Sequence, residues 1–106
     1  MMRPNQYQRL AMRTDCYKGF FEAALNLHAE VGKICGKIYK AYRDGDGTIS
    51  GQARVDLMNE CGDALWQLVK IIDHYGYQLE DVMKMNIEKL ADRYSRDVVH
   101  GAGDNR

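Results

Sequence analysis

The sequence predicts an all-α protein, and three observations carry that prediction. Apolar residues recur at three- and four-residue spacing along most of the chain, as they do on one face of a helix. No segment alternates with a period of two for long enough to suggest a sheet. The single proline, Pro4, lies outside every periodic segment. We therefore expect four helices with short links, which favour antiparallel neighbours and a four-helix bundle-like subunit.

The first two predicted helices cover residues 5–18 and 20–42, with Gly19 as the break between them. Asn5 is a suitable N-cap for the first helix. The second helix ends at a glycine- and aspartate-rich segment, residues 43–47, which predicts a loop. Its apolar residues recur with helical spacing: Leu27, Val31, Ile34, Cys35, Ile38 and Tyr42.

The other two predicted helices cover residues 52–75 and 79–94. Gly76 is well placed as the C′ residue that ends the third helix. Residues 95–106 are rich in glycine and polar residues, and we expect them to form a flexible tail. The whole chain, residues 1–106, is predicted to be one helical domain.

The composition narrows the classes of function. Fifteen Lys and Arg residues balance 15 Asp and Glu residues, so a dedicated nucleic-acid or membrane-surface protein is not expected. No apolar run approaches the roughly 20 residues that span a bilayer, and no signal peptide is visible. Cys16, Cys35 and Cys61 are predicted to be reduced core thiols of a cytoplasmic protein. A chain of this size buries only about 60–65% of its unfolded surface, which favours a partner subunit.

Residues 44–50 resemble part of an EF-hand calcium loop, but the register excludes one. The first and twelfth positions would be Tyr42 and Ala53, where a calcium loop needs an aspartate and a bidentate glutamate. We interpret the segment as a helix–helix connection instead.

Two similar words lie in the second and third predicted helices: EVGK at residues 30–33 and ECGD at residues 60–63. Residues three apart share one face of a helix, so Glu60 and Asp63 lie side by side. Glycine inside a helix costs about 1 kcal/mol, which suggests that the two helices approach closely at these words. Glu30, Glu60 and Asp63 would then converge, and oxygen ligands of this kind suit Mg²⁺ or Mn²⁺. The alternative is three solvated charges, with Lys33 paired to Glu30 on the helix surface.

The fourth predicted helix carries a polar stripe. Asn86, Lys89 and Arg93 are spaced so that they share one helix face. An amide and two cations beside a metal site are suited to hold phosphate oxygens. The alternative is again a solvated face, to which Glu88 and Asp92 would contribute.

In order along the chain, these words resemble the MazG-like family of all-α nucleoside triphosphate pyrophosphohydrolases. The resemblance covers nearly the whole chain. The matching words are Tyr7-Gln8 with Ala11 and Thr14 in the first helix, NLHAEVGK at residues 26–33, Lys37 and Lys40 with the loop at 43–47, ECGDALW at residues 60–66, NIEKLADRY at residues 86–94, and GDNR at residues 103–106.

The resemblance implies a specific activity. Family members hydrolyse an NTP or dNTP to the monophosphate and pyrophosphate, with a water that Mg²⁺ activates (Mn²⁺ being a possible substitute) and that attacks the α-phosphorus. Carried over by position, Glu30, Glu60 and Asp63 match metal ligands and catalytic residues. The stripe on the fourth helix matches substrate-binding positions. The resemblance also implies a homodimer or homotetramer.

Lys33 departs from the family pattern, because it stands where the family has its second glutamate. The net charge of the four ligand positions is therefore −2 instead of −4. A second departure is Gln67, where a tyrosine often follows the tryptophan, and a third, milder one is Ala29, where the family has glycine. Three functions stay open for the sequence alone: a slower enzyme with one metal, a silent nucleotide-binding protein in which Lys33 contacts a phosphate, or a helical oligomerisation protein. Lys33 is also open as an introduced change in an otherwise active enzyme.

Overall fold

The structure, a computed structural model, describes residues 1–96 and is all-helical over that range. The helices are α1 (Pro4–Met12), α2 (Phe21–Asp44), α3 (Gly51–His74) and α4 (Leu79–Ser95). All four predicted helices are present, and no strand occurs within the described range. The predicted tail begins inside α4 at Ser95, and its residues 97–106 lie outside the described residues.

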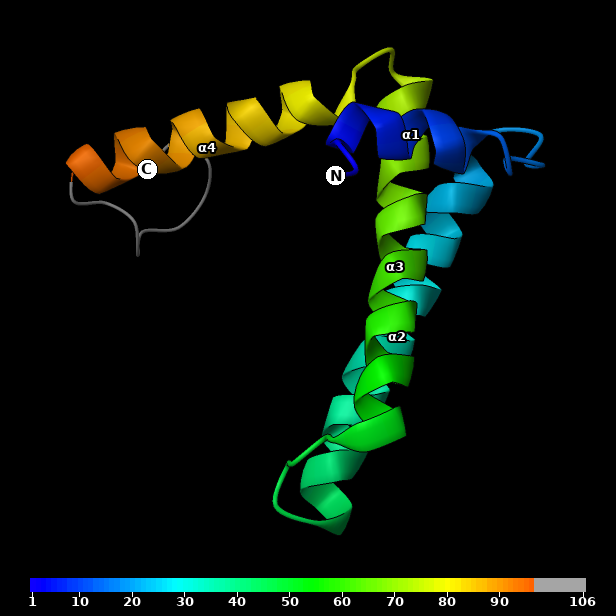
Figure 1. Cartoon of the computed structure of the whole chain (residues 1–106), viewed down its shortest axis with the longest axis vertical. Coiled ribbons are helices and arrows are strands. Elements are labelled where there is room, and N and C mark those ends of the chain that lie inside the picture. Colours follow the sequence, from blue (N-terminus) through cyan, green and yellow to red (C-terminus); the bar gives the residue numbers. More distant parts are fainter. Residues whose placement is uncertain (97–106) are drawn as a thin grey trace.

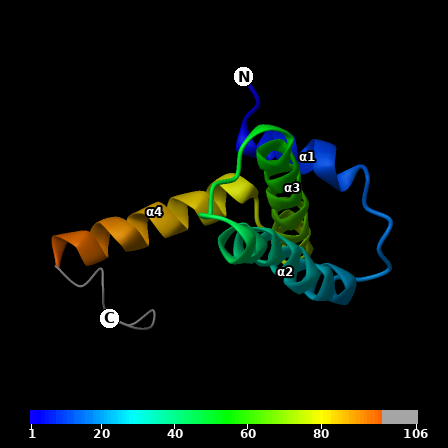
Figure 2. The same cartoon turned by 90° about the horizontal axis from the view of Figure 1, so that it is seen from below.

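The fold is a long helical hairpin with two appendages. α2 and α3 run side by side along most of their length, α1 lies across the end of α3, and α4 projects away from the hairpin (Figures 1 and 2). Within residues 1–96, α4 contacts α1 and α3 but not α2. The expected four-helix bundle therefore does not close within one chain, because the fourth helix leaves the hairpin instead of packing along it.

α1 is shorter than predicted at its C-terminal end and begins earlier. Pro4 is its first residue, where the fixed φ of proline suits a helix start, and Arg3 in extended conformation precedes it. The helix ends at Met12 because the next polar side chains bond to the backbone: Thr14 Oγ1 donates to Ala11 O at 2.7 Å. The predictions that Asn5 caps α1 and that Pro4 lies outside the helices were therefore wrong.

Asn5 instead helps to cap α4. Its Oδ1 accepts a hydrogen bond from the Glu80 backbone N–H at 2.9 Å, and Gln8 Oε1 accepts one from the Leu79 N–H at 2.6 Å. These N–H groups belong to the first turn of α4 and have no acceptor within the helix. Gln8 is buried, and its Nε2 also donates to Asp73 Oδ1 at 3.1 Å and to Tyr77 O at 3.0 Å. Side chains from α1 thus fix where α4 begins.

The α2–α3 and α3–α4 connections each use a glycine with positive φ. Gly47, in the α2–α3 loop, has φ +88°, and a Cβ there would lie 2.5 Å from the Tyr42 ring. In the same loop Asp46 Oδ1 accepts a hydrogen bond from the Thr48 N–H at 2.9 Å, so this aspartate shapes a turn. Gly76 has φ +80° and follows the last turn of α3, which agrees with its predicted C′ role.

Little apolar surface is fully buried in the single chain. Among residues 1–96, the buried hydrophobic residues are Ala23, Leu57, Ala64 and Val69. Large apolar side chains along α2, α3 and α4 stay exposed instead. The accessible surface is 8034 Å², whereas a monomeric protein of 12.2 kDa exposes about 6,100 Å².

The cysteines do not lie in a core of this chain. Cys16 and Cys35 are exposed and Cys61 is half-buried, and all three are free thiols. The prediction of core thiols was therefore wrong for the single chain, because Cys16 lies in the exposed α1–α2 connection and no element within residues 1–96 covers the face of α2 that carries Cys35. None of the described helices is both long enough and apolar enough to cross a membrane.

Candidate functional site

Three carboxylates meet at the middle of the α2–α3 hairpin. Glu30 comes from α2, and Glu60 and Asp63 come from successive turns of α3. One ligand oxygen from each residue lies within 4.8 Å of the other two. The antiparallel pairing of two long helices brings together residues that are 30 or more positions apart in the chain. The structure thus joins the three residues that the sequence singled out, and their role as metal ligands stays a prediction.

Two oxygens of this cluster are buried without a hydrogen-bond donor among the described residues. They are Glu30 Oε2 and Glu60 Oε2. The pKa of the Glu60 carboxyl group is raised, first by its hydrogen bond with Glu30 and then by burial, against the opposing charge of Lys33. Two adjacent carboxylates share a proton in this way when nothing else neutralises them. A cation would supply the same neutralisation without the proton.

Lys33 forms an ion pair at the edge of the cluster. Its Nζ lies 3.3 Å from Glu30 Oε1, and its side chain is 56% exposed while that of Glu30 is only 13% exposed. The hydrogen bond to Glu30, aided by the charge of Glu60, raises the pKa of Lys33, which therefore stays protonated. The ion pair engages Oε1 of Glu30 and leaves Oε2 of the same carboxylate unpaired.

The two helix glycines do not mark a close approach of α2 and α3. A Cβ placed on Gly32 or on Gly62 would meet no other atom within 4 Å, so the predicted backbone contact was wrong. The glycines instead leave open space beside the carboxylates. A hollow of about 550 Å³ opens there, and it is lined by Ala29, Gly32, Lys33, Gly36, Lys37, Lys40 and Glu60. We call it the lysine hollow.

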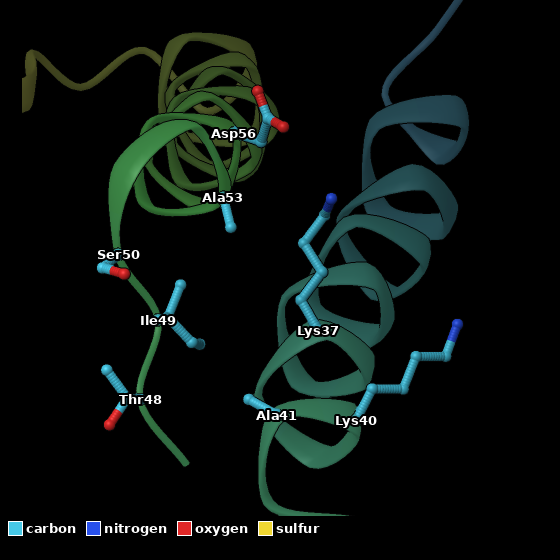
Figure 3. Close-up of a pocket in the computed structure, with 8 residues that line it drawn as sticks. All are labelled: Lys37, Lys40, Ala41, Thr48, Ile49, Ser50, Ala53 and Asp56. Atoms are coloured by element: carbon cyan, nitrogen blue, oxygen red, sulfur yellow. The ribbon is translucent and has the colours of Figure 1, made fainter. Parts of the chain in front are cut away.

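A second hollow of about 490 Å³ lies further along the hairpin, between α2, the loop and the start of α3 (Figure 3). Its lining shares Lys37 and Lys40 with the lysine hollow and adds Asp56 from α3. We call it the loop hollow. The two hollows together extend from the carboxylates to the end of the hairpin.

The predicted polar stripe of α4 is not brought to the carboxylates within one chain. Asn86 and Lys89 are exposed, whereas Arg93 is buried with 5% of its surface exposed. α4 carries all three away from α2, and it makes no contact with α2 within the described range (Figure 2). The pattern of the fourth helix gave no information about its direction in space.

Several polar residues near the cluster were not predicted. The Tyr17 hydroxyl donates to Gln67 Oε1 at 3.3 Å and accepts from Asn26 Nδ2 at 2.6 Å. Asn26 lies one turn before Glu30, so helical spacing alone would have placed it beside the site. Tyr17 comes from the α1–α2 connection, and no periodicity places a loop residue.

Tyr7 also lies close to the cluster. Burial, and after it the negative charge of Asp63, raises the pKa of the Tyr7 hydroxyl. This links α1 to the carboxylate cluster through space, although α1 supplies no carboxylate to it.

The cluster fits a hard divalent cation. Its donors are all carboxylate oxygens, which Mg²⁺, Mn²⁺ and Ca²⁺ accept and which zinc sites seldom use alone. The two buried oxygens that lack a donor are the positions where a cation would make up the missing interaction. No other group of three His, Cys, Asp or Glu residues with this geometry occurs among residues 1–96.

The chain matches a family model and a phage protein. Residues 22–97 match the family model described as the MazG nucleotide pyrophosphohydrolase domain. Over 92 residues the chain is 36% identical to the "Gene 37 protein" of Mycobacterium phage L5, a match that covers 87% of this chain and 81% of the phage protein. No solved structure matches the chain significantly.

Proposed function

Because the chain belongs to the MazG nucleotide pyrophosphohydrolase domain family, we propose that it hydrolyses nucleoside triphosphates to the monophosphate and pyrophosphate. The observation that carries this proposal is the meeting of Glu30, Glu60 and Asp63 with two buried oxygens left without a donor. An acidic cluster of that kind is unfavourable by itself and becomes favourable with a cation. The family membership and the carboxylate cluster are independent observations, and both support cation-dependent hydrolysis of a nucleoside triphosphate.

In this proposal Glu30, Glu60 and Asp63 hold Mg²⁺, with Mn²⁺ as the substitute. A divalent cation at such a site supplies Lewis acidity and neutralises charge on the phosphates. In the reaction a water oxygen bonds to the α-phosphorus, and the bond from that phosphorus to the bridging oxygen breaks. The bridging oxygen leaves with pyrophosphate, and the water proton passes to solvent. The ExGD pair on α3 is complete, so α3 provides the fixed half of the site.

A homodimer or homotetramer is the second part of the proposal. The surface of the single chain exceeds the monomer expectation by about 1,900 Å², which is more than the roughly 800 Å² that each partner buries in an interface of standard size. Exposed apolar residues on α3 and α4 supply that surface, among them Leu65, Leu68, Met83 and Leu90. α4 projects from its own hairpin, so in an assembly its stripe of Asn86, Lys89 and Arg93 would serve the carboxylates of a neighbouring chain (Figure 1).

A second candidate function rests on Lys33. Its ion pair with Glu30 occupies the place of a ligand and adds a positive charge beside the cation site. A protein with this arrangement binds nucleotide, with Lys33 against a phosphate, but turns it over slowly or not at all. A role in helical oligomerisation alone is the remaining alternative.

The position of bond cleavage separates these functions. Hydrolysis in water enriched in heavy oxygen, followed by mass spectrometry, should place the label in the nucleoside monophosphate and none in pyrophosphate. Label in inorganic phosphate would show attack at the γ-phosphorus and refute the proposal. A melting temperature that rises with nucleotide while no product forms would favour the silent binding protein.

A further inference from the structure

A row of three lysines continues the carboxylate site along α2. Lys33, Lys37 and Lys40 follow Glu30 at spacings that keep one face of a helix. The helix rises about 1.5 Å per residue, so the Cα positions of Glu30 and Lys40 are roughly 15 Å apart along its axis. Long side chains lean toward the N-terminus of their helix, which brings each ammonium group closer to the carboxylates than its Cα position.

The three lysines differ in their partners. Lys33 is paired with Glu30, whereas neither Lys37 nor Lys40 has an ion pair or a side-chain hydrogen bond with any residue in the described range, 1–96. Both are exposed, and both line the lysine hollow and the loop hollow. Figure 3 shows the two side chains rising from α2 toward its earlier turns, which are the turns that carry Lys33 and Glu30. Two unpaired cations thus face open space next to the acidic cluster.

The floor of the lysine hollow is formed by small residues. Ala29, Gly32 and Gly36 lie on this side of α2, and a Cβ on either glycine would meet nothing within 4 Å. The absent side chains leave room for a bulky group to approach the helix backbone between the carboxylates and the lysines. An inward-facing large side chain at these positions would fill the hollow.

The charges around the hollows favour an anion with several negative groups. The lysine hollow is lined by three lysines and one carboxylate, Glu60, which also belongs to the proposed cation site. The loop hollow adds one further carboxylate, Asp56, opposite Lys37. An anion is therefore held best beside the lysines, between Asp56 and the carboxylate cluster, whose negative charge the proposed cation would neutralise.

We propose that Lys37 and Lys40 bind the two terminal phosphates of the nucleoside triphosphate and then the pyrophosphate that leaves. This assignment rests on the proposed function, which places the α-phosphorus at the carboxylates. The β- and γ-phosphates then extend along α2, where the lysines are the next polar groups. When the bond to the bridging oxygen breaks, the leaving pyrophosphate gains negative charge, and the two ammonium groups stabilise it. Lys37 is attracted to Glu60 and Lys40 to Asp44 at longer range, but neither lysine forms a close ion pair within residues 1–96 that would have to break.

The test measures binding of inorganic pyrophosphate with Mg²⁺ by calorimetry. The variants are Lys37→Gln, Lys40→Gln and the double variant, and the matched control is Lys18→Gln, an exposed lysine before α2 that does not line either hollow. Substitution of either Lys37 or Lys40 should weaken pyrophosphate binding roughly tenfold, because a hydrogen bond between charged groups is lost. The control should bind as the wild type does, and all five proteins should have the same melting temperature because the substituted side chains are exposed.

Binding of a nucleoside monophosphate supplies the internal comparison. It lacks the two terminal phosphates, so its affinity should be the same in the double variant and the wild type. Equal pyrophosphate affinity in the wild type, the double variant and the control would overturn the assignment, as would a wild type that binds no pyrophosphate. Pyrophosphate release from a triphosphate with unchanged KM in the double variant would also overturn it while leaving the proposed function intact. Loss of pyrophosphate affinity in the double variant, in a protein without turnover, would refute the proposed hydrolysis and support the phosphate site.

Discussion

Gln8 is expected to be the most important single polar residue for the placement of α4. It is buried, and its side chain forms three hydrogen bonds, to Asp73 Oδ1, to the Tyr77 carbonyl and from the Leu79 N–H. Each such bond contributes about 0.5–1.5 kcal/mol net, so the sum is about 1.5–4.5 kcal/mol. Asp73 and Tyr77 are exposed, and water will replace part of what they lose. We therefore expect Gln8→Ala to reduce the free energy of unfolding by about 2–3 kcal/mol.

Gln6→Ala is the matched control, because Gln6 lies on the same helix, is exposed, and forms one hydrogen bond of 3.3 Å with the Arg3 N–H. Its expected cost is below about 0.5 kcal/mol. Urea unfolding followed by circular dichroism measures the free energy of unfolding of both variants. In a thermal scan the melting temperature of the Gln8 variant should be about 10 °C lower than that of the wild type. All proteins are compared at one concentration, since assembly shifts the apparent stability. If the two variants differed by less than about 0.5 kcal/mol, the reasoning about buried caps would be refuted.

Three further predictions concern an ion pair, a loop and the cation site. Lys70 Nζ lies 2.6 Å from Asp15 Oδ2, and this contact lowers the pKa of Asp15; Asp15→Asn should cost about 1–3 kcal/mol at pH 7. The stabilisation from Asp15 is complete above its unfolded pKa of about 3.9 and is lost as the pH falls below that value. The free energies of unfolding of the wild type and the variant should therefore converge as the pH is lowered. A difference that stays constant with pH would contradict the ion pair. Gly47→Ala should destabilise by about 1–3 kcal/mol, because it combines φ +88° with a Cβ 2.5 Å from the Tyr42 ring, and an unchanged melting temperature would show that the loop relaxes freely. Mg²⁺ at 100 times its Kd should stabilise the wild type by about 2.7 kcal/mol and Asp63→Asn by clearly less, whereas equal stabilisation would place the cation elsewhere.

The two long helices were predicted well, because apolar residues at helical spacing indicate a helix that packs on one side. α2 and α3 are such helices, and their ends fall within a few residues of the prediction. Helical spacing placed Glu60 and Asp63 on one face of α3, whereas their convergence with Glu30 was expected from a contact between helix glycines that is absent and from the family resemblance. Asn5 shows the limit: the residue type indicated a helix cap, but the helix it caps lies 75 positions further along the chain. Pairings of that kind depend on the tertiary fold.

The direction in which α4 points, and whether the helix glycines face another backbone or open space, could likewise not be predicted. A stripe of polar residues defines a face of a helix and says nothing about where the helix points, so Asn86 was expected beside Glu30 and is not there in one chain. Gly32 was expected at a contact between backbones, and it borders open space instead. Both errors arose because one sequence cannot tell a surface used within the chain from one left open for a ligand or a partner.

The carboxylate site is tested by the rate of Mg²⁺-dependent pyrophosphate release from wild type, Lys33→Glu and Glu60→Gln, measured across the common nucleoside triphosphates. Lys33→Glu removes the ion pair at Glu30 and restores a fourth carboxylate, so its rate should rise by roughly tenfold or more over the wild type. Glu60→Gln should abolish release, because it removes a ligand from the intact half of the site. If none of the triphosphates yields pyrophosphate with either the wild type or Lys33→Glu, the three carboxylates are not the centre of a pyrophosphohydrolase and the account is contradicted.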